Sequence, residues 1–238
     1  MQELGYTRSS RQADHMLLTP DTFVRAPLPG MRNATAIVHA NPAIGAAFTQ
    51  YTVEFAAGGA MPPSAVQRFL YVLEEEVTVT LAGQKNLLQE GGYAYLPSAS
   101  KAEISASGAA RAEVIEKPYL PLAGVQPAQA IFSNESNVKP QPLGDGLAVC
   151  VLLPENSSFD FAVNTMTYQP GAALPMVEAH VMEHGLLMLA GGGIYRLGDR
   201  WYPVTAGDFI WMAPWCPQWF GALGRKPAKY LIYKDWNR

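Results

Sequence analysis

The sequence predicts an all-β fold made of two tandem barrel-type units. Short runs of alternating apolar and polar residues recur along the chain, glycine and proline turns separate them, and the second half repeats the pattern of the first. The length of 238 residues allows one or two domains with a sizeable core. Apolar residues form 49% of the chain and charged residues 16%, which indicates a compact globular protein.

The first half is expected to fold as short strands. The clearest run, Val-Thr-Val-Thr-Leu at 77–81, alternates at the strand period and ends in a turn at 82–84. Turn-flanked short segments at 17–20 and 27–30 precede the strands, and a short helix is the alternative only at 62–69. The expected strands of this half are 34–39, 47–55, 69–73, 77–81, 93–97 and 111–118.

A linker rich in proline and glycine follows, marked by Pro118, Pro121, Gly124 and Pro127. We therefore predict an N-terminal domain over 1–125 and a C-terminal domain over 126–238. Strands are expected to resume at 147–153, 161–168, 185–189, 194–197, 201–204, 209–212 and 230–233.

The two halves match without gaps when the chain is shifted by the distance between Arg68 and His184. Phe69–Leu73 then falls on 185–189, and the turn glycine Gly91 falls on Gly207. The histidines do not repeat, because His184 corresponds to an arginine in the first half. The first unit is therefore expected to keep the scaffold and to lack metal ligands.

The segment 176–191 holds the candidate ligands. Two of the four histidines in the chain, His180 and His184, lie four residues apart, and Glu178 precedes the first by two. Alternate residues of an extended chain share a face, so Glu178 and His180 point the same way, and His184 joins them if the chain turns near Glu183. Neutral imidazoles and a carboxylate are the usual ligands of a borderline divalent metal.

This segment and a later one resemble the two motifs of the cupin family, G-x5-HxH-x3-4-E-x6-G and G-x5-PxG-x2-H. The match departs from the common form in its ligands: Glu178 stands at the first His, His184 at the Glu, and Gln218 at the last His. One further departure is that Gly171 lies one residue further from the first ligand than is usual. The residues that carry the match are Gly171, Glu178, His180, His184, Gly191, Gly207, Ala213, Trp215 and Gln218.

The exchanged ligand set, in the second half of a two-cupin chain, is similar to that of the (S)-ureidoglycine aminohydrolase family. The likeness extends from Gly5-Tyr6-Thr7-Arg8 to Tyr230 and Tyr233-Lys234-Asp235. The resemblance implies two tandem cupin domains with a jelly-roll β-barrel fold, of which only the second binds manganese. It further implies hydrolysis of ureidoglycine to ureidoglycolate with release of ammonia, in purine catabolism.

The resemblance also implies the site. Glu178, His180, His184 and Gln218 would hold the metal, a mixed nitrogen and oxygen set that suits Mn²⁺, Fe²⁺ or Zn²⁺. The catalytic candidates Tyr195, Tyr230 and Lys234 match positions that line the substrate pocket of the family. Lys234 can bind the substrate carboxylate or carry protons to the leaving amine, and both roles stay open.

Other interpretations of these residues remain. Cys216 is a rival ligand to Gln218 on the same segment, although only Gln218 has the motif spacing. Tyr195 and Tyr230 can be ordinary strand aromatics, and Lys234 can form a surface ion pair with Asp235. We interpret His15 and His39 as structural or surface residues. Two other function classes stay open: a non-haem metal oxygenase, and a sensor or storage protein that binds a small molecule.

Composition narrows the partners and the compartment. A net charge of −3 gives no electrostatic reason to expect nucleic acid or an anionic membrane. Cys150 and Cys216 are too few for a disulfide framework, and 1–11 carries no apolar signal segment. We therefore predict a cytoplasmic protein with a small-molecule substrate that assembles as a homo-oligomer, either a dimer or a ring of dimers.

Overall fold

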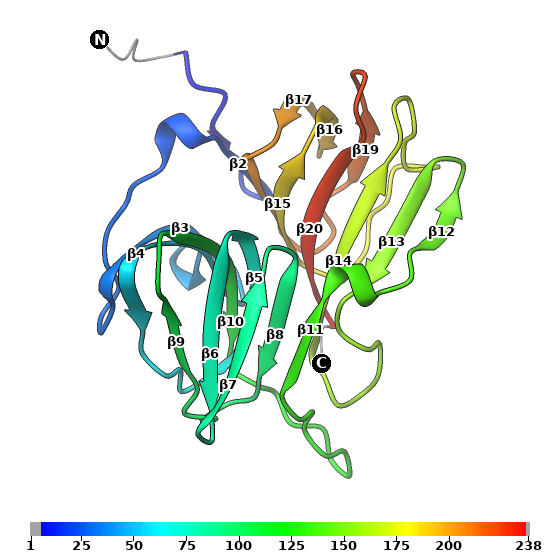
Figure 1. The fold of residues 1–238 in the computed structure, drawn as a ribbon. Coiled ribbons are helices and arrows are strands. Elements are labelled where there is room, and N and C mark those ends of the chain that lie inside the picture. Colours follow the sequence, from blue (N-terminus) through cyan, green and yellow to red (C-terminus); the bar gives the residue numbers. More distant parts are fainter. Residues whose placement is uncertain (1–5, 237–238) are drawn as a thin grey trace. The chain divides into compact units, whose positions relative to one another are not determined.

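The computed structural model describes residues 6–236, and it confirms the all-β prediction (Figure 1). Residues 1–5 and 237–238, and with them Gly5 of the N-terminal match, lie outside the described part of the chain. Within residues 6–236, three short 3-10 turns occur, at Pro20–Thr22, Pro42–Ile44 and Glu135–Asn137. Among residues 6–236, no helical segment combines the length and the apolar character that crossing a membrane requires.

One compact unit comprises Val24–Val138 with Asn156–Asp160. Its strands form one antiparallel sheet in the order β11-β8-β5-β10-β4-β9-β6-β7, with β3 paired to β4. The inward side chains, such as Tyr51, Val72 and Val114, form its core. The strands are β3 (Arg32–Ala40), β4 (Thr49–Met61), β5 (Gln67–Glu74), β6 (Glu76–Leu81), β7 (Gln84–Gln89), β8 (Gly92–Leu96), β9 (Glu103–Ala106), β10 (Ala110–Lys117) and β11 (Ile131–Asn134).

Of the described residues, the other compact unit comprises 6–23, Lys139–Glu155 and 161–236. One sheet has the order β1-β2-β18-β15-β20-β14-β13-β12, and a smaller sheet has the order β17-β16-β19. The side chains of Leu186, Tyr195 and Tyr230 lie in its core. The strands are β1 (Ser10–Arg11), β2 (His15–Leu18), β12 (Gln141–Gly144), β13 (Leu147–Val151), β14 (Phe161–Tyr168), β15 (His184–Ala190), β16 (Gly192–Leu197), β17 (Arg200–Thr205), β18 (Phe209–Met212), β19 (Gln218–Ala222) and β20 (Ala228–Asp235).

Two segments belong to the unit opposite to the one that the predicted division of the chain gives them. The N-terminal strand β2 pairs with β18, and β11, which follows the predicted linker, pairs with β8. The predicted boundary between 125 and 126 therefore lies inside the unit that ends at Val138. The division of the chain into domains at residue 125 stays a proposal. Below, the unit built around Val24–Val138 is called the first barrel, and the other unit is called the second barrel.

The expected strands agree well with the observed ones. The ranges 161–168 and 209–212 coincide with β14 and β18. The helical alternative at 62–69 is wrong, because Gln67–Phe69 pairs with β10 and Phe69 also with β8, and the preceding residues are irregular. Pro63 disfavours a helical backbone conformation at the residue before it, Pro62.

Candidate metal centre and pocket

Strands β14, β20 and β15 lie side by side in the second barrel (Figure 1), and β15 and β20 carry the candidate residues His184, Tyr230 and Lys234. His184 begins β15, and Lys234 is its direct partner on β20. Side chains alternate between the two faces of a strand. Because Tyr230 and Ile232 belong to the barrel core, Lys234 points to the same interior side.

His184 is buried and has one ring nitrogen free for a ligand. Its Nδ1 donates a hydrogen bond to the carbonyl oxygen of Tyr233 at 3.0 Å, so the lone pair lies on Nε2. That Nε2 lies 3.4 Å from the Nε2 of His180. Burial, with help from His180 and Lys234, lowers the pKa of His184 to about 3, and the ring is neutral at pH 7.

Gln218 completes a group of three donors. Its side-chain nitrogen lies 3.0 Å from His180 Nε2, and the Tyr195 hydroxyl donates to its oxygen at 3.4 Å. The backbones of Gln218 and Glu178 exchange two hydrogen bonds of 2.8 Å, which fixes the irregular segment before His180 against β19. The structure thus brings together His180, His184 and Gln218 side by side.

This group fits a divalent ion with two adjustments. Two imidazole nitrogens 3.4 Å apart have about the separation of neighbouring ligands on one ion. The amide of Gln218 presents its nitrogen, so it must turn to offer oxygen. In the described part of the chain, the ligand atoms of Glu178, His180 and His184 do not all lie within 4.8 Å of one another, so the Glu178 carboxylate would have to turn toward the histidines to join them. His180 Nδ1, buried without a hydrogen-bond partner within residues 6–236, leaves that ring free to shift.

The neighbouring carboxylate, Glu183, faces elsewhere. It is buried and accepts a hydrogen bond of 2.7 Å from the indole nitrogen of Trp211. Its backbone carbonyl accepts from the amide of Asp235 at 3.0 Å. These contacts hold the Glu183 side chain and the start of β15 in place, so Glu178 stays the candidate carboxylate.

Three tyrosines line the interior next to the histidines. The hydroxyls of Tyr168 and Tyr230 lie 2.7 Å apart, and Tyr230 also approaches the sulfur of Met166 at 3.2 Å. Burial raises the pKa of Tyr168, Tyr195 and Tyr230 above the usual phenol value, so all three are neutral hydrogen-bonding groups at pH 7. Sequence reasoning missed Tyr168, because nothing but the pairing of β14 with β20 places it beside Tyr230.

Lys234 is the cationic side chain beside these groups. Burial lowers the pKa of its ammonium, while Glu155 and Glu178 act in the opposite direction. When the Asn164 amide is oriented to satisfy both of its ends, its oxygen accepts from Lys234 Nζ at 3.2 Å. Asp235 points to the other face of β20 and accepts from the Tyr233 hydroxyl at 3.2 Å. Asn164 was not foreseen from the sequence, because no motif includes it.

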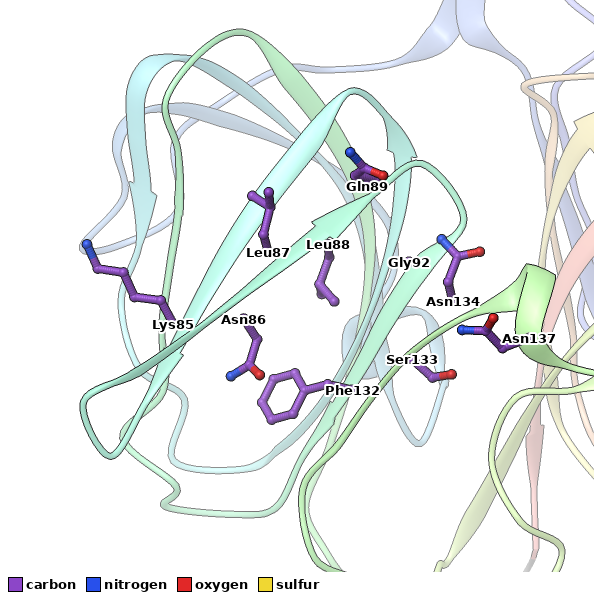
Figure 2. A pocket seen from close by; sticks show the side chains of 10 residues that line it. All are labelled: Lys85, Asn86, Leu87, Leu88, Gln89, Gly92, Phe132, Ser133, Asn134 and Asn137. Carbon is purple, nitrogen blue, oxygen red and sulfur yellow. The ribbon is translucent and has the colours of Figure 1, made fainter.

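A different pocket lies in the first barrel, and its lining within residues 6–236 includes no histidine, cysteine or carboxylate side chain. Figure 2 shows it between β7, β8 and β11, with a volume of about 580 Å³. Most polar groups lining it are amides, and Asn134 is occupied by hydrogen bonds to Ser136 and to the Glu90 carbonyl. Its residues are Lys85, Asn86, Leu87, Leu88, Gln89, Gly92, Phe132, Ser133, Asn134 and Asn137. The group of His180, His184 and Gln218 in the second barrel therefore remains the stronger candidate for a functional site.

The two barrels and the donor set define a protein of the cupin class, and residues 164–233 match the family model described as Cupin domain. The chain is 39% identical to a probable (S)-ureidoglycine aminohydrolase of Oryza sativa, over 98% of this chain and 77% of that protein. It is 31% identical to the (S)-ureidoglycine aminohydrolase of Escherichia coli K12, over 96% and 90% of the two. The chain belongs to the (S)-ureidoglycine aminohydrolase family.

A solved structure agrees with this assignment. The crystal structure of a putative glyoxylate-induced protein from Pseudomonas aeruginosa is 31% identical and superposes with a TM-score of 0.91. It covers 100% of this chain and 94% of that one. The fold prediction of two tandem cupin-type barrels is confirmed at this level.

Proposed function

We propose that the chain hydrolyses (S)-ureidoglycine to (S)-ureidoglycolate and ammonia, as a step of purine catabolism. The observation that carries this proposal is the placement of Lys234 beside His184 in the second barrel of a chain that is 39% identical to a relative of that name. In the reaction, a C–N bond breaks, a C–O bond to water forms, and the departing amine takes up a proton.

The proposed ligands of one divalent ion are Glu178, His180, His184 and Gln218, and the proposed ion is Mn²⁺, although Fe²⁺ or Zn²⁺ suits the same donors. A bound ion of this kind orients the substrate and neutralises its charge. The protein contributes the neutral form of His184 and the backbone pairing that holds Glu178 and Gln218 on neighbouring segments.

The proposed catalytic residues are Tyr195, Tyr230 and Lys234. The neutral phenols can hydrogen-bond the ureido and carboxylate groups and hold the reacting carbon in one orientation. Lys234 has a lowered pKa, which brings its ammonium closer to exchanging a proton near neutrality. We therefore assign proton transfer to the leaving amine to Lys234, with binding of the substrate carboxylate as the competing role.

A direct test combines metal analysis with turnover. We expect one manganese ion per chain in the second barrel, and ammonia release from freshly generated ureidoglycine that is the same with and without oxygen. Consumption of oxygen without ammonia would support an oxygenase instead, and tight binding without turnover would support a sensor. Light scattering should give a dimer or a ring of dimers, and a monomer at micromolar concentration would contradict the proposed assembly.

A further inference from the structure

A second group of metal-ligand side chains lies in the second barrel, apart from the histidine pair. Within residues 6–236, Asp14, His15 and Cys216 form a trio of acidic, imidazole and thiol groups whose ligand atoms all lie within 4.8 Å of one another. His15 and Cys216 are buried, at 2% and 3% exposure, whereas Asp14 is partly accessible. The trio therefore has two protected donors and one donor that opens toward solvent.

The ring of His15 is held in the orientation of a ligand. Its Nδ1 lies 2.8 Å from Asp14 Oδ1, and its Nε2 lies 2.8 Å from the hydroxyl of Tyr202. Histidines that bind metals through one nitrogen usually donate the other N–H to a neighbouring group, which fixes the ring. Tyr202 on β17 supplies such a partner, so Nδ1 is the nitrogen available for an ion that also meets Asp14.

Cys216 is brought to the trio by a tight loop. The amide of Ala213 donates to the carbonyl oxygen of Asp14 at 2.9 Å, and the amide of Cys216 donates to the carbonyl oxygen of Ala213 at 3.2 Å. Trp215 adopts a positive φ of 68°, which is unfavourable for a bulky residue and costs about 1 kcal/mol or more. In this conformation the thiol donates to the carbonyl oxygen of Pro217 at 3.6 Å and lies within 4.8 Å of the ligand atoms of Asp14 and His15.

The surroundings suit a bound ion. The amide of Gly198 donates to the carbonyl oxygen of Pro217, the residue after Cys216, at 2.8 Å, and a Cβ built on Gly198 would lie 3.4 Å from Asp14 Oδ2. A pocket of about 490 Å³ opens beside the trio, lined among others by Asp14, His15, Arg196 and Arg200. An ion held by the trio would thus have one open side, facing water and two arginines.

We propose that Asp14, His15 and Cys216 form a second metal site, selective for zinc and similar thiophilic divalent ions. A thiolate, an imidazole and a carboxylate are zinc ligands, and three protein ligands leave a fourth tetrahedral position for water or a small anion from the pocket. The oxygen and nitrogen of Asp14 and His15 need to separate only from 2.8 Å to roughly 3.3 Å to share one ion. The thiol proton leaves to solvent as the ion binds.

The loop between the two sites gives this ion a means of affecting the first. The Trp215 amide donates to the carbonyl oxygen of His180 at 2.7 Å, and Gln218 follows Cys216 by two residues. Fixing Cys216 would therefore hold the segment that carries Gln218. The site acts as a positioning element for the proposed manganese centre and contacts neither substrate nor reacting atoms.

The experiment uses the full-length chain, freed of metal by a chelator, loaded with one equivalent of Mn²⁺ and then titrated with Co²⁺. Cobalt bound by sulfur gives a charge-transfer absorption in the near ultraviolet that a site made of oxygen and nitrogen donors does not give. We expect this band to saturate at one Co²⁺ per chain and to disappear in Cys216→Ser. The matched control, Cys150→Ser, and the manganese-site variant His184→Ala should keep it.

Two further measurements test the proposal even if Cys216→Ser fails to fold. Tyr202→Phe should weaken the Co²⁺ affinity about tenfold without changing the band at saturation, because the phenol orients His15 and is not a ligand. X-ray absorption at the zinc edge of the wild-type protein, loaded with Mn²⁺ first, should show one sulfur at about 2.3 Å from zinc. A zinc shell of oxygen and nitrogen alone, a cobalt band that survives Cys216→Ser, or one lost in Cys150→Ser would overturn the proposal.

Discussion

The two barrels place a different pair of residues at the same position of the same scaffold. In the first barrel, Arg68 on β5 faces Glu116 on β10, and the two form an ion pair of 2.7 Å. In the second barrel, the register partner of His184 on β15 is Lys234 on β20. The Arg68–Glu116 pair combines a positive and a negative charge that neutralise each other, whereas the His184–Lys234 pair combines a neutral ring and a cation.

This difference explains how one barrel can be structural and the other chemical. The guanidinium of Arg68 has no lone pair to offer an ion, and it is further held by the carbonyl oxygen of Pro62 at 3.0 Å. His184 presents the lone pair of its Nε2 and Lys234 a largely desolvated ammonium, which suits the metal ion and the anionic substrate that we propose for the second barrel. The same position of the scaffold thus holds an internal ion pair in the first barrel and candidate site residues in the second.

The largest expected effect comes from His184→Ala. The variant removes a ring whose tautomer is fixed by a backbone carbonyl, so we expect loss of the bound manganese and a fall in ammonia release of about 10⁴-fold or more. Metal analysis and the ammonia assay on the same sample measure both effects. Full metal occupancy in this variant would remove His184 from the ligand set.

A smaller effect is expected for Lys234→Met. The side chain is not a proposed ligand, so the ion should stay, while ammonia release falls about 10³-fold, within the range for loss of a general acid or base. Lys229→Met is the matched control, because Lys229 lies on the opposite face of the same strand. If Lys234→Met raises KM and leaves kcat unchanged, the ammonium binds the carboxylate and transfers no proton.

In the first barrel the corresponding change should affect stability and leave chemistry alone. Arg68→Met leaves the Glu116 carboxylate without its partner, and we expect a loss of about 3 kcal/mol in the free energy of unfolding. Arg25→Met, which breaks the exposed pair with Glu54, should cost under about 1 kcal/mol. Urea titration measures both, and a metal or activity loss in folded Arg68→Met would contradict the scaffold assignment.

Much of this comparison could be predicted from the sequence because strand period and turn residues are local signals. The runs 161–168 and 209–212 are short, rich in apolar and β-branched residues, and match β14 and β18. β2 was missed because its pairing partner, β18, lies far along the chain. β9 and β19 were also missed, since both are short and lie beside polar or glycine-rich turns.

For the site, motif spacing found His180, His184 and Gln218, which the structure brings together. Spacing could not find Tyr168 or Asn164, whose positions follow from the register of β14 against β20. It also led us to treat His15 as a structural or surface residue, since nothing in the sequence places the N-terminal strand beside the loop of Cys216. Contacts between distant segments were the missing information.

The last prediction concerns a second difference between the barrels, which is a buried carboxyl group at a position where the second barrel has a leucine. Glu113 on β10 pairs with Thr52 in the same way as Leu231 on β20 pairs with Thr165. The Glu113 carboxyl is buried and accepts from the Gln50 amide at 2.9 Å and the Thr52 hydroxyl at 2.6 Å. Burial raises its pKa to about 7, although both hydrogen bonds act against that shift.

Because the folded state holds the Glu113 proton more tightly than the unfolded chain, stability falls as the pH rises from about 4.5 to about 7. Burial lowers the pKa of nearby His39 to about 3, which makes stability rise with pH up to about 6.5 and masks the trend in the wild type. Glu113→Gln removes only the first contribution. Between pH 5 and pH 8 the free energy of unfolding of the variant should increase by about 2.5 kcal/mol relative to that of the wild type, measured by urea unfolding at both values. A constant difference between the two proteins would mean that the Glu113 carboxyl titrates in the folded protein as it does in the unfolded one.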